Sequence, residues 1–101
     1  MSVEGTRRQH HELLRELQEE RAAALARISR RLEFLIAQLE ATREQIAHAP
    51  QESRARHEAA YRELHTQAVK YRWYLEVQRE AIGLRQHQRL DEFYRIPPLE
   101  L

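Results

Sequence analysis

The stretch IAHAPQESR (residues 46–54) contains one of only three prolines in the chain, and the other two stand near the C-terminus. Proline disfavours helical angles in the residue before it, whereas proline itself, or the serine three residues on, suits the start of a new helix. We therefore expect a helix over residues 6–48, a tight turn at 49–52 and a second helix over residues 53–95. A short connection between two long helices predicts an antiparallel helical hairpin.

Composition favours the same all-α, coiled-coil-like architecture. Charged residues make up 33% of the 101 residues, and glycine occurs only twice. The charged residues are almost all glutamate and arginine. These residues lose little conformational entropy on entering a helix, and the same holds for the abundant glutamine, leucine and alanine. A chain of this length is expected to form a single domain.

The first half carries apolar residues at alternating spacings of three and four, which is the heptad pattern of a coiled-coil seam. The residues of this seam are Leu25, Ile28, Leu32, Leu35, Leu39, Thr42 and Ile46. Leu14 and Leu17 extend it toward the N-terminus, with Arg21 interrupting the apolar pattern. The first helix is therefore predicted to bury this seam against the second.

The second half places apolar residues on two sides of a helix when successive residues are set 100° apart. The stripe expected to face the first helix is Leu64, Ala68, Tyr71, Leu75, Ile82 and Phe93. The other stripe, about 160° away by the same geometry, is Ala55, Ala59, Trp73, Val77 and Leu84. One hairpin covers only one stripe, and Phe34 lies similarly far from the seam of the first helix. We therefore expect a homodimer that forms a four-helix bundle, or a further protein partner that covers Trp73 and Phe34.

Several classes of site are missing from the sequence. No cysteine is present, so thiol catalysis and disulfides are excluded. None of the six histidines stands three residues after a glutamate, which is the spacing used by metal-binding bundles. Glycine is too scarce for a phosphate-binding loop, and no pair of catalytic groups is recognisable. We expect no enzyme activity, no cofactor, no metal and no small-molecule substrate.

The chain shows neither an apolar run approaching the ~20 residues of a membrane span nor an export signal. We therefore expect a cytoplasmic protein without membrane association. The remaining function is that of a non-catalytic protein–protein interaction module, such as an adaptor, an assembly factor or a small regulator. The residues expected to form the dimer or partner interface are Phe34, Trp73, Val77 and Leu84, with Arg72, Arg79 and Arg85 at the rim.

A nucleic-acid-associated protein is the alternative, because the second helix mixes arginines with aromatic residues. The side chains that this interpretation uses are Arg54, Arg72, Arg79, Trp73 and Tyr74. The net charge of +1 and the spread of the arginines around the helix argue against it.

The C-terminal part changes character. Gly83 interrupts the helical pattern and costs about 1 kcal/mol there relative to alanine, which fits either a bend or a tolerated kink. Beyond it, residues 96–101 contain two consecutive prolines, which predict an extended tail. The residues of a candidate docking tail are Tyr94, Ile96, Pro97, Pro98 and Leu99. A frayed terminus is the alternative. If the turn at 49–52 straightened, the same seams would pair between chains as a domain swap.

Overall fold

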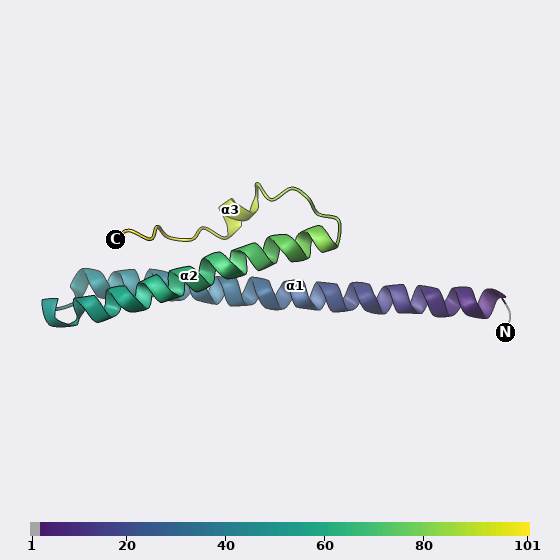
Figure 1. Ribbon diagram of the computed structural model, residues 1–101, viewed down its shortest axis with the longest axis horizontal. Helices are drawn as coiled ribbons and strands as arrows, with labels where there is room; N and C mark the ends of the chain where they lie inside the picture. Colours follow the sequence, from purple (N-terminus) through teal and green to yellow (C-terminus); the bar gives the residue numbers. More distant parts are fainter. Residues whose placement is uncertain (1–2) are drawn as a thin grey trace.

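The computed structural model describes residues 3–101, and within that range it contains helices and loops but no strand. Helix α1 (Val3–His48) and helix α2 (Gln51–Ala81) run antiparallel, and a short helix α3 (Leu90–Phe93) follows. Figure 1 shows a long, narrow molecule, with Cα extents of 74 × 23 × 15 Å. The predicted all-α antiparallel hairpin is confirmed.

The turn between α1 and α2 consists of Ala49 and Pro50. Pro50 has φ −60° and ψ 152°, an extended conformation that redirects the chain. The N–H of Ser53 donates to the Pro50 carbonyl at 3.1 Å, and the Ser53 hydroxyl donates to the same oxygen at 3.2 Å. These bonds close the first turn of α2, which begins at Gln51, so the turn is shorter than the 49–52 expected.

The core of the hairpin is the predicted heptad seam of α1 packed against one side of α2. The buried residues of α1 are Leu32, Leu35, Leu39, Thr42 and Ile46, and those of α2 are Tyr61, Ala68 and Leu75. Each fully buried leucine stabilises the fold by roughly 1.5–3 kcal/mol relative to an exposed one. The one polar member, Thr42, donates its hydroxyl to the Gln38 carbonyl at 2.7 Å, so its burial leaves no unpaired donor.

Helix α2 ends at a glycine cap. Gly83 has φ +91°, in the left-handed region that side chains with a Cβ rarely adopt. Its N–H donates to the Glu80 carbonyl at 3.0 Å, and the N–H of Leu84 donates to the Arg79 carbonyl at 2.9 Å. This pair of bonds is a Schellman motif, which satisfies the last carbonyls of the helix and turns the chain away.

The prediction of a helix over residues 53–95 is therefore wrong beyond Ala81. Two residues that the helical pattern placed in the core are exposed instead: Ile82 to 40% and Phe93 to 69%. The physical reason is the reversal of the chain at Gly83. The prediction assigned these residues to the core by their angular position around a continuous helix, and the helix ends before that position applies to them.

The C-terminal segment (residues 84–101) folds back along the hairpin toward the turn, as Figure 1 shows. Leu90 in α3 and Pro97 in the extended part are buried, and Tyr94 and Ile96 pack against the core of the hairpin. This segment adds a third layer to part of the hairpin. The frayed terminus that the sequence left open is not what the structure shows.

Helix α1 is much longer than α2, and its N-terminal part extends alone (Figure 1). The Nη1 of Arg21 lies 3.4 Å from the carbonyl of Ala81, the last residue of α2, which marks the level where α2 stops. We call residues 3–20 the overhang. Its large apolar side chains, Val3, Leu13, Leu14 and Leu17, are all exposed. The seam extension predicted at Leu14 and Leu17 is therefore not buried within one chain.

Candidate interaction surface

A series of aromatic rings extends from α1 onto α2 and continues around α2. We call Phe34 of α1 together with Tyr71, Trp73 and Tyr74 of α2 the aromatic surface. The guanidinium of Arg31 joins the two helices, since its Cζ lies 5.4 Å from the centre of the Phe34 ring and 5.9 Å from that of Tyr71. Both distances are within the range of cation–π attraction.

On α2 the rings are in direct succession. Tyr71 and Tyr74 meet edge to face with their centroids 5.4 Å apart and their planes at 75°, and the Trp73 ring lies 5.6 Å from that of Tyr74. The Nζ of Lys70 is 5.7 Å from the Tyr74 centroid. The aromatic surface therefore runs from Phe34 to Trp73 and is bordered by two cations.

The two ends of the aromatic surface are open to solvent: Phe34 is 52% exposed and Trp73 is 59% exposed. The helical geometry of the sequence predicted this exposure, because a single neighbouring helix cannot cover rings on opposite sides of α2. Val77, one turn after Trp73, is also exposed, whereas Tyr71 and Tyr74 are half-buried. Phe34, Trp73 and Val77 are thus presented on two helices that are held rigid by the core between them.

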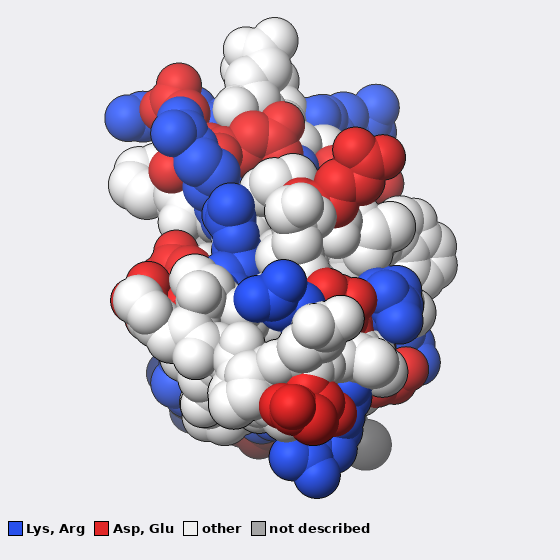
Figure 2. All heavy atoms as spheres, turned by 90° about the vertical axis from the view of Figure 1, so that its left-hand side faces the viewer, with Lys and Arg blue, Asp and Glu red and all other residues white. Residues whose placement is uncertain are grey.

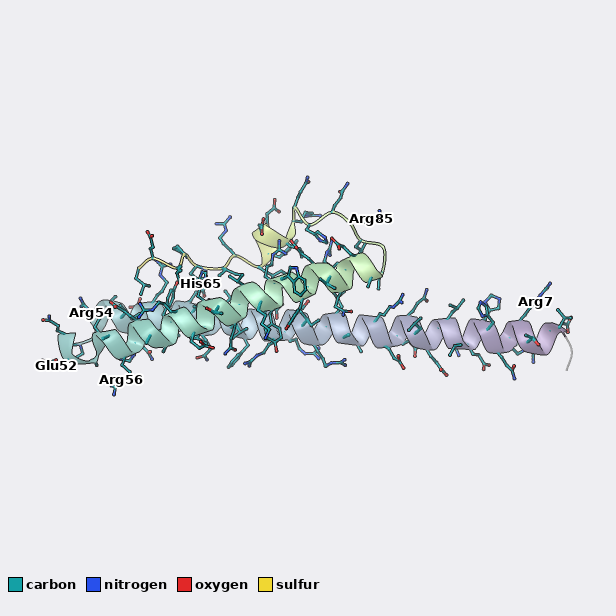
Figure 3. The ribbon with its side chains drawn as sticks, viewed as in Figure 1. Arg7, Glu52, Arg54, Arg56, His65 and Arg85 are labelled. Atoms are coloured by element: carbon teal, nitrogen blue, oxygen red, sulfur yellow. The ribbon has the colours of Figure 1, made fainter. Side chains whose placement is uncertain are left out.

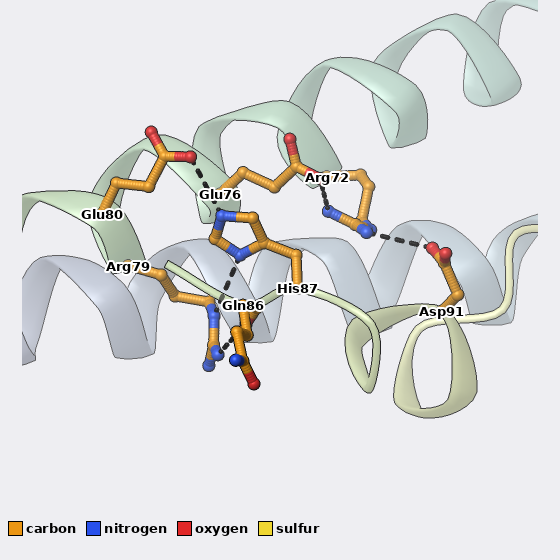
Figure 4. Close-up of polar contacts among 7 residues, drawn as sticks. All are labelled: Arg72, Glu76, Arg79, Glu80, Gln86, His87 and Asp91. Carbon is orange, nitrogen blue, oxygen red and sulfur yellow. Dashed lines mark hydrogen bonds and ion pairs between the residues drawn. The ribbon is translucent and has the colours of Figure 1, made fainter. Parts of the chain in front are cut away.

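Arg72, predicted at the rim of this surface, faces elsewhere. Around the helix, the Arg72 side chain points 100° away from that of Tyr71 and 160° away from that of Tyr74. Its Nη1 contacts Glu76 Oε1 at 2.8 Å and its Nη2 contacts Asp91 Oδ1 at 3.0 Å, as Figure 4 shows. The Arg72 side chain is only 14% exposed, so it holds the C-terminal segment on α2.

Arg79 has a similar role, again different from the rim position predicted for it. Its Nη2 donates to the Gln86 carbonyl at 2.9 Å, and its Nε lies 3.4 Å from Nδ1 of His87 (Figure 4). The other ring nitrogen of His87, Nε2, lies 3.0 Å from Glu80 Oε1. Both arginines therefore belong to the contact between α2 and the C-terminal segment.

Leu84 and Arg85, the remaining predicted interface residues, lie in the loop beyond Gly83. Both are exposed and line a shallow pocket that also includes Arg79 and Gln86. Since α2 ends before them, the structure does not bring these two residues together with Trp73.

The candidate docking tail is bound to its own hairpin. The Tyr61 hydroxyl donates to the Pro98 carbonyl at 2.6 Å, and the Tyr61 ring is fully buried, with 0% exposed. Burial raises the pKa of the Tyr61 phenol above its ordinary value of 10.0, and the positive charge of Arg43 offsets part of that effect. The phenol is therefore a stable hydrogen-bond donor to the tail at neutral pH.

Tyr61 is the residue that the sequence interpretation missed. It stands three residues before Leu64 and seven before Ala68, so it continues the buried stripe of α2. That spacing was a sufficient signal for burial. What the spacing did not provide was the partner of the hydroxyl, because the carbonyl of Pro98 lies 37 residues away in the chain.

The arginines needed for a nucleic-acid platform do not gather. Figure 3 shows Arg54 near the turn and Arg85 near the far end of α2, while Arg72 and Arg79 are engaged with the C-terminal segment. The end-on view in Figure 2 shows basic and acidic side chains interspersed on the face around the turn. These arginines therefore do not form the concentrated basic surface that phosphate binding requires.

Within residues 3–101, no three histidine or carboxylate side chains come close enough to hold a metal ion. In the same range no helix is sufficiently long and apolar to cross a bilayer. Comparison of the chain with models of protein families, with curated proteins and with solved structures gave no match.

Proposed function

We propose that this chain is a non-catalytic interaction module that binds a partner protein through the aromatic surface. The observation that supports the proposal is the series of rings from Phe34 to Trp73, in which Arg31 links Phe34 to Tyr71 and both ends are exposed. Tryptophan, tyrosine and arginine are the residues most enriched among the energetic anchors of protein interfaces. Rings on rigid helices also lose little conformational freedom when a partner covers them.

The chemistry of the surface specifies the kind of partner. Apolar anchor residues of the partner pack on the rings. Acidic residues beside those anchors pair with the cations Arg31 and Lys70, which lie next to the rings. An amphipathic helix with leucine or phenylalanine anchors and flanking glutamates satisfies both requirements. The C-terminal segment is held by Arg72, on the other side of α2 from Tyr74, and so leaves this surface uncovered. The module acts as an adaptor, an assembly factor or a small regulator in the cytoplasm.

The test uses the full chain with the double substitution Phe34→Ala and Trp73→Ala. Phe93→Ala is the matched control, because Phe93 is an equally exposed ring (69%) in α3 and outside the aromatic surface. Proteins captured on the immobilised wild type and identified by cross-linking should remain bound to the control and be lost from the double variant. Retention by the double variant would contradict the proposal.

The single tryptophan provides a direct readout of binding. Because Trp73 is 59% exposed, its fluorescence should shift to shorter wavelength when a partner excludes water from it. Cross-links that join the captured protein to residues around Trp73 would support the proposal. If the wild type instead dimerises through this surface, light scattering will show a dimer that the double variant lacks, and the partner is then a second copy. Fractionation of cells that express the tagged chain tests the cytoplasmic location.

A further inference from the structure

The overhang is a single helix with an apolar stripe that no other part of residues 3–101 covers. Leu13, Leu14 and Leu17 follow one another at the spacings that place side chains on one side of a helix, and Val3 lies on the same side. Their exposed fractions run from 41% at Leu17 to 70% at Val3. The overhang continues the packed part of α1 and needs no helix nucleus of its own, but its apolar stripe remains in water. The overhang therefore gains from any neighbour that covers this stripe.

The charges of the overhang are divided between its two ends. Residues 7–11 hold Arg7, Arg8 and two histidines, with no acid. Residues 12–20 hold four glutamates against one arginine. None of the ion pairs found in residues 3–101 involves these side chains. One end of the overhang is thus basic, the other is acidic, and no ion pair among the described residues neutralises either charge.

The sequence of the overhang is also self-complementary under reversal. Turning residues 7–20 end for end about the midpoint between Leu13 and Leu14 places the basic residues level with the acidic ones. Under the same operation Leu13 falls level with Leu14 at the centre, whereas Leu17 falls level with His10. A second copy in antiparallel orientation therefore matches the overhang in charge along its length and in apolar contact at its centre.

We infer that two copies of the chain associate through their overhangs, packed side by side and antiparallel. Helix α2 already runs antiparallel to α1 and covers its seam as far as Arg21, where Ala81 ends it. The overhang of the second copy runs along α1 in the same direction as α2. Its residues 7–20 cover residues 20–7 of the first copy, beyond the end of α2. Figure 3 shows Arg7 at the distal end of the uncovered helix, where the acidic residues of the second copy would lie.

A pocket at the end of α2 supports this placement. It lies in the step where α2 stops and is lined by Gln18, Arg21, Ala22, Ala81 and Ile82. In the antiparallel arrangement, Gly5 and Thr6 of the second copy fall level with Ala22 and Arg21 of this lining. The exposed side chain of Ile82 lies at the same step. A parallel arrangement brings like charges together at both ends of the overhang and leaves this pocket empty.

The antiparallel arrangement predicts the affinity of the dimer and its length. The shared length is about 14–18 residues, or roughly 21–27 Å of helix, which is small for a permanent dimer. The dimer should therefore form at micromolar concentrations and weaken with added salt. Two bodies of 74 Å that share this length give a particle about 120 Å long. A pair joined side by side through the aromatic surface would remain close to the length of one chain.

The first experiment measures sedimentation and small-angle X-ray scattering of the full chain over a series of concentrations. We expect a monomer–dimer equilibrium, with a maximum dimension near 120 Å for the dimer. Leu13→Ala with Leu17→Ala should weaken the association at least tenfold, because alanine keeps the helix and two large side chains of the apolar stripe are lost. Phe34→Ala with Trp73→Ala is the matched control and should leave the association unchanged. A wild type that stays monomeric at millimolar concentration, or a dimer no longer than one chain, would overturn the inference.

The second experiment tests the antiparallel placement through charge. Arg7→Glu with Arg8→Glu makes both ends of the overhang acidic, and Glu19→Arg with Glu20→Arg makes both ends basic. Each variant alone should associate at least tenfold more weakly than the wild type at low salt, whereas an equimolar mixture of the two should recover wild-type association. Circular dichroism confirms that each variant retains its helices. Equal self-association of the variants, or a mixture that stays monomeric, would refute the antiparallel pairing.

Discussion

Replacing Tyr61 by phenylalanine removes a single hydrogen bond and leaves the buried ring in place. The phenol donates to the Pro98 carbonyl at 2.6 Å, and this bond ties the last residues of the chain to α2. Because Pro98 is exposed, its carbonyl can accept a bond from water once the phenol is gone. The free energy that holds the C-terminal segment on α2 then falls by the net value of one hydrogen bond, about 1 kcal/mol.

A loss of about 1 kcal/mol corresponds to roughly a fivefold change in an equilibrium. We therefore expect the fraction of molecules with a detached C-terminal segment to rise about fivefold in Tyr61→Phe. Limited digestion with trypsin measures it, because cleavage after Arg95 follows the population of the open form. Cleavage after Arg8, in the overhang, is the internal control and should keep its wild-type rate.

The pH dependence of stability provides an independent check on the same group. The pKa of Tyr61 is raised above 10.0 in the folded chain, so folding favours the neutral phenol. The contribution of this phenol to the free energy of unfolding is fully present below the ordinary pKa, and it is lost as pH rises through the raised pKa. Thermal unfolding should therefore show wild type more stable than Tyr61→Phe at pH 8, with the difference vanishing at higher pH. An ultraviolet titration should find a tyrosine that ionises above pH 10.0 in the wild type and is missing in the variant.

Unchanged cleavage after Arg95 in Tyr61→Phe would refute the role of this hydrogen bond. Faster cleavage at both Arg95 and Arg8 would also contradict it, because the substitution would then have loosened the whole chain and not one segment.

Three further substitutions test other parts of the structure. Leu39→Ala empties a site that is 0% exposed and should cost 2–5 kcal/mol in urea unfolding, where a smaller loss would contradict the assigned core. Gly83→Ala meets no atom within 4 Å but keeps φ at +91°, so it should cost about 1–2 kcal/mol locally and accelerate cleavage of the C-terminal segment. Asp91→Asn removes an ion pair whose carboxylate is 80% exposed; the loss should stay below about 1 kcal/mol and disappear in high salt.

The hairpin was predictable because its determinants are local or periodic. The seam from Leu25 to Ile46 repeats at coiled-coil spacing, and Pro50 marks the reversal by its own geometry. The exposure of Phe34 and Trp73 was predictable for the same reason, since helical angles place both away from the core. The bridge formed by Arg31 between the rings was not, because long side chains select a rotamer only after the helices are packed.

The C-terminal segment was not predictable, because its placement depends on contacts between residues far apart in the chain. Gly83 is compatible with a helix interior and with a cap, so its presence alone did not show that α2 ends there with a positive φ. The misassignment of Arg72 and Arg79 has the same origin. Around an isolated α2 both arginines face water, and they become contact residues only when Asp91 and His87 fold back onto them.

The return of the C-terminal segment also imposes an order on folding. Tyr61 and Pro98 are separated by 37 residues, so their contact closes a long loop of chain. The turn between the two long helices is short and helix formation takes microseconds, so the helices can pair before the C-terminal segment docks. Until that docking, the Tyr61 hydroxyl lacks its partner at Pro98. The C-terminal segment is therefore the last part of the chain to acquire its native contacts.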